Sequence, residues 1–422
     1  MSREMVNSGI PWMGEIPKDW EIRKVKDVFV RKNEKAHQEN PVILSLARSG
    51  IKVRDISTNE GQLAESYFDY NPVEPFDLLI NPMDLYSGAN CSMSSVTGVI
   101  SPAYVNLRAK GDISPRYYDY YFKTQYWSMA FFAHGKGVSF DNRWTLGVDT
   151  LLRYNIPYPS IVKQHKIASF LDKKCGEIDE MIALQEQIIE ELKVYKQSVI
   201  TEVVTKGLNP DIQMKDSGIE WIGEIPEHWN TRRIGTLFRL RDEKNYKSMD
   251  EVQLLSLYTG IGVFPHGEQE ERGNKAVTVE GYKVVHKNDI VVNIILAWMG
   301  AIGISDYDGV TSPAYDVYIP STSVIPHYYH YVFRTKGIAG ECYKYGRGIM
   351  MMRWRTYSSE FKQISIPFPS MEEQQEIADY LDEKCSEIDS LINIKLSKID
   401  SLKEYKKSII YEYVTGKKEV TE

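Results

Sequence analysis

The residues with the clearest potential for binding chemistry are cations set among glycines and tryptophans. One segment reads Gly135-Lys136-Gly137 with Arg143-Trp144 after it, and a second reads Gly346-Arg347-Gly348 with Arg353-Trp354-Arg355 after it. Glycines beside a cation let the backbone approach a phosphate closely, and an arginine can donate two hydrogen bonds to a phosphate or a guanine. The pattern predicts nucleic-acid contacts at Lys136, Arg143, Arg347, Arg353 and Arg355. The alternative is a surface turn with solvated charges and a framework Arg–Trp stack.

A second group of cations lies where two otherwise similar segments diverge. Ile43–Leu46 and Leu254–Leu257 both read as short buried strands, each containing Leu-Ser-Leu. The loop after the first strand carries Arg48 and Arg54, whereas the loop after the second ends at His266. Similar strands with dissimilar loops are what two sites of different specificity require, so Arg48 and Arg54 join the predicted DNA contacts. The sequence assigns no base to any of them.

Patterns that would support autonomous catalysis are missing from the sequence. Gly260-Ile-Gly262 lacks the third glycine of a dinucleotide loop, and there is no P-loop. The segment from Asn81 to Asp84 lacks the aromatic residue that an adenine methyltransferase needs after Asn-Pro-Pro. The histidines have no metal-ligand spacing, and the carboxylates lie mostly among lysines on helix faces. We therefore predict no catalytic residue, no metal ligand and no cofactor bound by this chain.

Two long helices must position these segments, because one long stretch occurs twice. Residues 160–207 return as residues 370–417, with most landmarks 210 positions apart. Apolar residues recur there at steps of three and four, which is typical of a helix-pairing seam. The predicted seam is Ile167, Leu171, Cys175, Ile178, Ile182, Ile189, Leu192, Tyr195, Val199 and Val203, and in the second copy Ile377, Leu381, Cys385, Ile388, Ile392, Ile399, Leu402, Tyr405, Ile409 and Tyr413.

The two helices are expected to pair with each other in antiparallel fashion. The connector after the first helix is short, so the globular domain that follows lies near the end of that helix, and the second helix runs back from it. The expected result is a rod with a globular domain at each end and a pseudo-twofold axis. Apolar residues also lie off the seam, and we expect partner helices to cover them, forming a bundle. The predicted partner-binding residues are Met181, Ile188, Ile200 and Leu391.

The globular parts repeat as well, which fixes the predicted domain organisation. The Trp12-to-Trp20 segment returns at Trp221-to-Trp229, and both read as aromatic anchors of an irregular arm. The tyrosine-rich helices predicted near 115–124 and 326–335 read as core elements, with nucleic-acid stacking as the alternative. The fold class is α+β, with two similar mixed domains separated by two long antiparallel helices. The predicted domains are 1–159 and 208–369, and the helical spacers are 160–207 and 370–422.

Composition narrows the class of protein. The chain has 422 residues and a net charge of −7, which argues mildly against nucleic-acid binding unless basic residues cluster locally. No apolar run reaches transmembrane length, and no signal-peptide pattern begins the chain, so no membrane partner is expected. The four cysteines, Cys91, Cys175, Cys342 and Cys385, form no Cys-x-x-Cys pair. We expect reduced thiols in a cytoplasmic protein.

Taken in order, these motifs resemble the specificity subunit of type I restriction–modification systems over nearly the whole chain. The resemblance rests on Trp-x-Gly-Glu-Ile-Pro-x-x-Trp, Ser-Pro-Ala-Tyr, the Gly-x-Gly to Arg-Trp segment, and Pro-Ser followed by Gln-x-x-Ile-Ala and a long helix, each present twice. It implies two target recognition domains on double-stranded DNA, two methyltransferase subunits on the helices, and motor-nuclease subunits. The complex would use S-adenosylmethionine, ATP and magnesium, and this chain would supply recognition of a split asymmetric site.

A rival hypothesis from another class is a protein-interaction scaffold whose helical rod joins two modules that do not bind DNA. A third hypothesis, a self-sufficient methyltransferase, predicts that the isolated chain binds S-adenosylmethionine.

Overall fold

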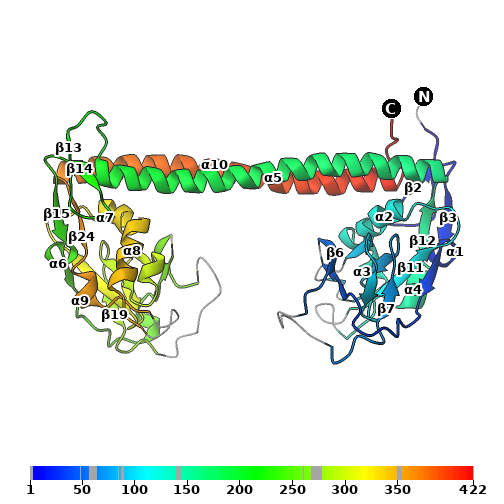
Figure 1. The fold of residues 1–422 in the computed structure, drawn as a ribbon, viewed down its shortest axis with the longest axis horizontal. Coiled ribbons are helices and arrows are strands. Elements are labelled where there is room, and N and C mark those ends of the chain that lie inside the picture. The colour runs from blue at the N-terminus through cyan, green and yellow to red at the C-terminus, as the bar shows by residue number, and fades with distance from the viewer. Residues whose placement is uncertain are drawn as a thin grey trace. The chain divides into compact units, whose positions relative to one another are not determined.

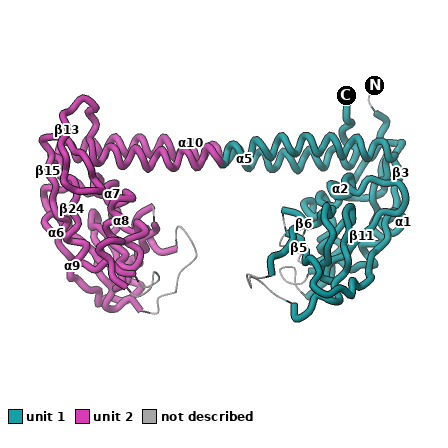
Figure 2. Tube along the Cα trace, viewed as in Figure 1, with its two compact units in different colours: residues 1–186, 396–422 teal, residues 187–395 magenta. Residues whose placement is uncertain are grey.

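The chain folds into two compact units, each built from two separate stretches of sequence. The structure is a computed structural model and describes residues 3–47, 49–56, 64–83, 85–86, 90–138, 144–259, 261–267, 278–348 and 354–421. Unit 1 comprises residues 1–186 and 396–422, and unit 2 comprises residues 187–395 (Figure 2). Arg48, Arg143 and Arg353 lie outside the described residues.

The globular part of unit 1 is a mixed α/β domain built around one four-stranded sheet (Figure 1). A four-stranded antiparallel sheet has the order β4-β11-β8-β9, and four strand pairs surround it: β1-β2, β3-β12, β5-β6 and β7-β10. The elements are β1 (Met5–Asn7), β2 (Glu15–Pro17), β3 (Glu21–Lys24), α1 (Val25–Val28), β4 (Phe29–Lys32), β5 (Leu44–Ala47), β6 (Gly50–Val53), β7 (Asn71–Val73), β8 (Leu78–Ile80), β9 (Cys91–Met93), β10 (Gly98–Ile100), β11 (Val105–Ala109), α2 (Pro115–Trp127), α3 (Ala130–Ala133), α4 (Val148–Leu152) and β12 (Asn155–Tyr158).

Unit 2 repeats this topology strand for strand. Its four-stranded sheet is β16-β23-β20-β21, with the pairs β13-β14, β15-β24, β17-β18 and β19-β22. The elements are β13 (Met214–Asp216), β14 (Glu224–Pro226), β15 (Asn230–Arg233), α6 (Ile234–Leu237), β16 (Phe238–Leu240), η1 (Met249–Glu251), β17 (Leu255–Tyr258), β18 (Gly262–Pro265), β19 (Lys283–Val285), β20 (Ile290–Asn293), η2 (Ala297–Met299), β21 (Ile302–Ile304), β22 (Gly309–Thr311), β23 (Tyr315–Pro320), α7 (Pro326–Phe333), α8 (Lys336–Tyr345), α9 (Ser358–Phe361) and β24 (Ser365–Phe368).

Aromatic side chains fill the core of each domain. Tyr117, Tyr118 and Tyr121 of α2 are fully buried, as are Tyr328 and Tyr329 of α7. Trp20 and Trp229 are buried in the same two cores. The structural interpretation of these tyrosines and tryptophans is therefore confirmed, and none of the five tyrosines can stack on a nucleic acid.

Two long helices, α5 (Ile161–Lys206) and α10 (Met371–Val414), pass from one unit into the other. Their antiparallel pairing is visible inside each unit. In unit 1 the Lys406 ammonium lies 2.7 Å from Oδ1 of Asp179. In unit 2 the Lys196 ammonium lies 2.7 Å from Oδ1 of Asp389. The predicted fold class, with its internal repeat and antiparallel helices, is confirmed.

The ends of the long helices are fastened to the domains by equivalent contacts. Buried Gln164 accepts from the backbone N–H of Ser114 and donates to the carbonyl of Pro159. Gln374 does the same with Ile325 and Pro369. At the C-terminal ends, the Tyr117 hydroxyl donates to the Val414 carbonyl (2.8 Å), and the Tyr328 hydroxyl donates to the Val204 carbonyl (2.9 Å). These bonds satisfy backbone carbonyls that a helix end leaves unpaired.

Most of the predicted seam is buried, but two members are wrong. Tyr195 and Tyr405 are 51% and 58% exposed. On that turn the neighbouring residues Lys196 and Lys406 face the other helix and pair with its aspartates. The tyrosines, one position earlier and about 100° around the helix, therefore point to solvent.

Candidate nucleic-acid interface

The cation segments form loops that are closed at their base by backbone hydrogen bonds. Lys136 and Thr145 exchange two hydrogen bonds of 2.9 Å, and Arg347 and Arg355 exchange two of 2.9 and 3.0 Å. The two bridges occupy equivalent places, after α3 in unit 1 and after α8 in unit 2. Lys136, Arg347 and Arg355 therefore lie at a fixed base, which orients their side chains better than a free loop would.

A tryptophan holds each base in place, and it explains the first glycine of each motif. A Cβ at Gly135 would lie 2.6 Å from Cδ1 of Trp144, and a Cβ at Gly346 would lie 2.7 Å from Cδ1 of Trp354. The indole N–H of Trp144 donates to the Phe132 carbonyl, and that of Trp354 donates to the Tyr343 carbonyl. For Gly135 and Gly346 the structure thus supplies a packing reason that is independent of any phosphate.

The same tryptophans belong to an aromatic trio that occurs in both domains and that sequence reasoning missed. In unit 2 the Trp354 ring stacks on Tyr343 (centroids 5.2 Å apart), which lies 6.0 Å from Trp298. In unit 1 Phe132 lies 5.6 Å from Trp144 and 6.2 Å from Tyr86. Each trio comes from three separate segments, so no local motif reveals it. The signal available was aromatic residues recurring about 210 positions apart.

The bridge cations differ in how strongly the chain itself engages them. Arg347 forms an ion pair with Glu360, whose side chain is 11% exposed, while that of Arg347 is 73% exposed. Lys136 and Arg355 are exposed and have no ion pair with any residue of the described ranges. A DNA phosphate would therefore compete with a carboxylate at Arg347 but not at Arg355.

Arg54 and His266 occupy the same structural position in the two domains. The Arg54 N–H donates to the Ile43 carbonyl, and the His266 N–H donates to the Leu254 carbonyl, each at 2.8 Å. Arg54 shares an open pocket with Tyr70, Ser101 and Tyr104, so the structure brings it together with the Ser-Pro-Ala-Tyr segment. In the other domain Nδ1 of His266 lies 2.7 Å from the Ser256 hydroxyl. The equivalent hairpins β5-β6 of unit 1 and β17-β18 of unit 2 thus present different side chains at the same edge.

The segment around residues 82–86 connects the two parts of the site in unit 1. Met83 lines the Arg54 pocket. The N–H of Leu85 donates to the Trp144 carbonyl (3.2 Å), and the N–H of Leu146 donates to the Pro82 carbonyl (2.8 Å). The hairpin pocket and the loop base are therefore neighbours on one domain, which is what a continuous DNA-reading surface requires.

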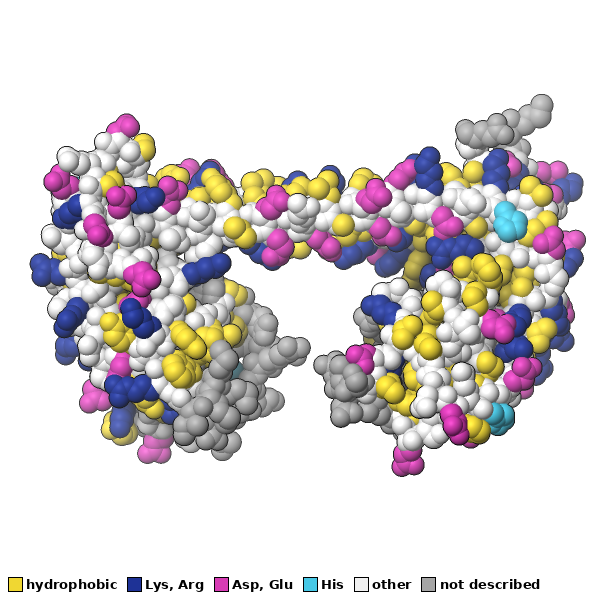
Figure 3. All heavy atoms as spheres, in the orientation of Figure 1, with side chains coloured by type: hydrophobic (Ala, Val, Ile, Leu, Met, Phe, Trp, Pro, Cys, Tyr) yellow, Lys and Arg dark blue, Asp and Glu magenta, His cyan; other side chains and the backbone are white. Residues whose placement is uncertain are grey.

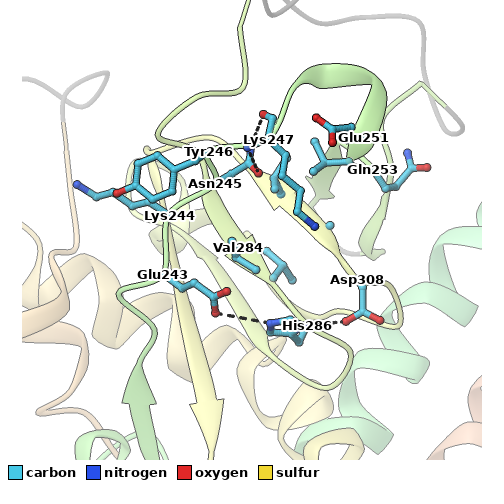
Figure 4. A pocket seen from close by; sticks show the side chains of 14 residues that line it. Glu243, Lys244, Asn245, Tyr246, Lys247, Glu251, Gln253, Val284, His286 and Asp308 are labelled. Carbon is cyan, nitrogen blue, oxygen red and sulfur yellow. Dashed lines mark hydrogen bonds and ion pairs between the residues drawn. The ribbon is translucent and has the colours of Figure 1, made fainter.

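A further polar pocket of unit 2 has a mixed charge that does not suit DNA (Figure 4). His286 lies between Glu243 (Nε2–Oε2 3.6 Å) and Asp308 (Nδ1–Oδ1 3.0 Å), and the hydrogen bond from His286 holds the pKa of Asp308 below its ordinary value. Lys244, Lys247 and Glu251 complete the charged lining. With three carboxylates against two lysines and a histidine, it offers no net positive field.

Three of the four predicted partner-binding residues lie at the surface of the long helices. Met181 and Leu391 are exposed and Ile188 is half-buried, and Figure 3 shows hydrophobic side chains at the surface of the paired helices. Ile200 contradicts the prediction because it is only 4% exposed and belongs to the core of unit 2. The last turns of α5 lie against their own globular domain, as the Tyr328–Val204 bond shows, so the face beyond the seam is already covered there.

Within the described ranges, no helix is long and apolar enough to span a bilayer, and no cluster of histidine, cysteine and acidic residues could hold a metal ion. The four cysteines are buried free thiols.

Known proteins resemble this chain in sequence and in fold. Residues 226–401 match the family model "Type I restriction modification DNA specificity domain". The chain is 23% identical to the type I restriction enzyme EcoBI specificity subunit of Escherichia coli, covering 92% of this chain and 84% of that protein. It is 25% identical to the putative type I restriction enzyme MjaX specificity subunit of Methanocaldococcus jannaschii, covering 97% and 96%.

Solved structures share the fold at low sequence identity. A chain from a study of complex assembly and conformational transition of the type I R-M system matches with a TM-score of 0.67, at 13% identity, over 94% of this chain and 98% of that one. The HsdS subunit from Thermoanaerobacter tengcongensis matches with a TM-score of 0.51, at 13% identity, over 95% and 98%. The duplicated domains, the paired long helices and the sequence matches agree, and together they indicate a specificity subunit of a type I restriction–modification system.

Proposed function

We propose that this chain recognises DNA for a type I restriction–modification enzyme, with each domain reading one half of a split, asymmetric site. The observation that carries the proposal is the pair Arg54 and His266. Their backbones occupy equivalent positions in the two domains, but their side chains differ in hydrogen-bonding capacity. An arginine favours guanine, whereas a histidine offers a single donor or acceptor on each ring nitrogen. Two copies of one framework with different reading residues suit two different half-sites.

The recognition role leaves chemistry to the partner subunits. We propose that two methyltransferase subunits bind the exposed apolar residues of α5 and α10, and that they use S-adenosylmethionine. Motor-nuclease subunits would supply cleavage with ATP and magnesium. The specificity subunit then acts by positioning its partners on DNA and catalyses nothing itself.

The first test is DNA binding by the chain together with its methyltransferase. We expect a gel shift on random DNA that weakens steeply with salt, because phosphate contacts release counterions. A shift that is absent, or that does not depend on salt, would favour a scaffold that does not bind DNA.

The second test separates the two half-sites. Methylome sequencing of a strain that expresses the system gives the motif directly. We expect Arg54→Ala to relax specificity in one half of that motif only, and His266→Ala to relax it in the other half only. Loss of one base contact corresponds to about 1–3 kcal/mol of discrimination. If both variants methylate the unchanged motif, neither residue reads a base.

A further inference from the structure

Trp20 and Trp229 lie at equivalent places beside the first turn of a long helix, but their surroundings carry opposite charge. In unit 2 the Trp229 indole N–H donates to Oε1 of Glu373 (2.9 Å), and the same carboxylate pairs with Nε2 of His228 (2.7 Å). In unit 1 the corresponding pair is Asp19 with Lys163. In unit 2 the acidic residue is on the helix and the basic residue precedes the tryptophan. In unit 1 these two places are exchanged.

The exchange of charges leaves the Trp20 indole without an acceptor. An ammonium group has three donors and no lone pair, so Lys163 cannot accept from an indole N–H as Glu373 does. Trp20 is 5% exposed, and its Nε1 has no hydrogen-bond partner among the described residues. A buried donor without a partner is costly, and such groups are rare in folded proteins.

The space beside Trp20 is a pocket lined by cations and by the apolar side chains of Val162, Ile167 and Val420. Arg3, Lys163, Lys166 and Lys418 line it together with Trp20, and the Arg3 guanidinium lies 5.3 Å from the centre of a Trp20 ring. Nearby carboxylates already engage three of these cations: Asp19 pairs with Arg3 and Lys163, and Glu412 pairs with Lys418. Glu419 also lines the pocket. Lys166 has no ion pair with any described residue.

We propose that this pocket of unit 1 binds a small oxyanion, which accepts the Trp20 indole N–H and is held by Lys166 and its neighbouring cations. Unit 2 shows the chemistry that the site requires, because there a carboxylate of the chain occupies the equivalent position. The ligand is either a carboxylate or a free phosphate, since both present oxygen acceptors to an N–H donor and ammonium groups. The site lies outside the DNA-reading loops and is independent of the proposed recognition function.

The indole signal of Trp20 tests the proposal directly. The chain has eight tryptophans, so an NMR spectrum of the ¹⁵N-labelled full chain has eight indole N–H signals. The missing signal of Trp20→Phe assigns the resonance. At constant pH and ionic strength, we expect phosphate or acetate to move the Trp20 proton downfield and to saturate, while chloride does not. Saturation by acetate identifies a carboxylate-type site, and saturation by phosphate alone identifies a phosphate site. A signal that neither anion moves overturns the proposal.

Matched variants distinguish a bound anion from a general salt effect. Lys166→Met should weaken the apparent affinity about two- to five-fold, the effect of losing one solvent-accessible ion pair. Asp19→His combined with Lys163→Glu rebuilds the arrangement of unit 2 and should abolish the anion-dependent shift. An equal anion response in wild type, Lys166→Met and the Asp19/Lys163 variant would contradict the site.

Discussion

Position 119 of unit 1 and position 330 of unit 2 are structurally equivalent but chemically different. Asp119 accepts from the Met93 N–H and pairs with Arg116 and Lys123. His330 takes its place, with Nδ1 3.3 Å from the Ile304 nitrogen and Nε2 2.8 Å from Nη1 of Arg334. A neutral imidazole accepts at only one ring nitrogen and can serve one of these two donors. Protonation would remove that lone pair as well and would set the charged ring against a guanidinium. Burial, with a smaller contribution from Arg334, accordingly lowers the pKa of His330 to about 3.

This environment predicts acid sensitivity of unit 2. The folded-state pKa lies below the ordinary histidine value of about 6.5, so the neutral form contributes stability above that value and the contribution is lost as pH falls toward the folded pKa. Between pH 7.5 and pH 5 we expect wild type to lose about 2 kcal/mol from this group. His330→Asn, whose amide oxygen can still accept from the Ile304 N–H, should lose much less. Urea unfolding at both pH values measures the difference.

His165→Asn is the matched control because His165 is exposed on α5. Its pH dependence should equal that of wild type. If His330→Asn also follows wild type, the acid sensitivity originates elsewhere.

The loop cations should differ in their contribution to DNA affinity. Arg355→Ala should lower affinity by about 1–3 kcal/mol if it reads a base, or weaken binding to all sequences and reduce the salt slope by about 1 if it contacts a phosphate. Arg347→Ala should cost less, because Arg347 must first leave Glu360. Gel shifts over a salt series on specific and random DNA measure both quantities.

Lys287→Ala provides the control, since Lys287 is an exposed cation of the same unit in the turn after β19. If Arg355→Ala and Lys287→Ala change DNA affinity and the salt slope equally, Arg355 has only a structural role at the loop base.

At the scale of elements, periodicity predicted the long helices, and the tyrosine-rich composition predicted the buried aromatic helices. A capping box starts α10: Glu373 accepts from the Ser370 N–H, and Ser370 accepts from the Glu373 N–H. Periodicity gives the faces of a helix but not the surface that will cover each face. For that reason Ile200 was assigned to a partner, although the domain of its own unit buries it.

Tertiary contacts between distant segments could not be predicted from the sequence either. The hydrogen bond from Tyr117 to Val414 joins residues 297 positions apart, and the aromatic trios gather three segments each. The cations at Lys136, Arg347 and Arg355 were found from local composition, but the bridges that fix them required the fold. Only the internal repeat offered a sequence signal, because equivalent contacts recur in both halves.

The exposed apolar residues of the helices predict where a methyltransferase binds. Leu391 and Ile394 of α10 are 46% and 62% exposed, so charging them should leave the fold intact. We expect Leu391→Glu and Ile394→Glu to abolish co-purification with the methyltransferase while the circular dichroism and unfolding midpoint stay near wild type. Ile200→Glu should instead destabilise the chain, because it buries a charge in the core of unit 2.

Ser390→Glu is the control, an exposed neighbour of Leu391 that adds the same charge without removing apolar surface. If both Leu391→Glu and Ile394→Glu still co-purify with the methyltransferase, the partner interface does not lie on this face.

At the scale of the whole molecule, the two helices keep one register in both units. Asp179 pairs with Lys406 in unit 1, and Asp389 pairs with Lys196 in unit 2; each residue of the first pair has its counterpart 210 positions away in the second. The two ion pairs thus follow the internal repeat of the sequence. An insertion into α5 alone would lengthen only one helix between the two ion pairs, whereas equal insertions after Gln187 and Ser397 lengthen both helices between these pairs by the same amount.

The last prediction is that helix length sets the gap between the two DNA half-sites. Four residues added to each helix lengthen it by about 6 Å and add a rotation of about 40° beyond a full turn. DNA rises about 3.4 Å per base pair, so the preferred gap should grow by one or two base pairs. The half-site sequences should stay the same because the reading loops are untouched. Methylome sequencing of the double-insertion variant measures both. An active variant with an unchanged gap would mean that joints outside the helices set the spacing, and the α5-only insertion serves as the control that should lose stability through its broken register.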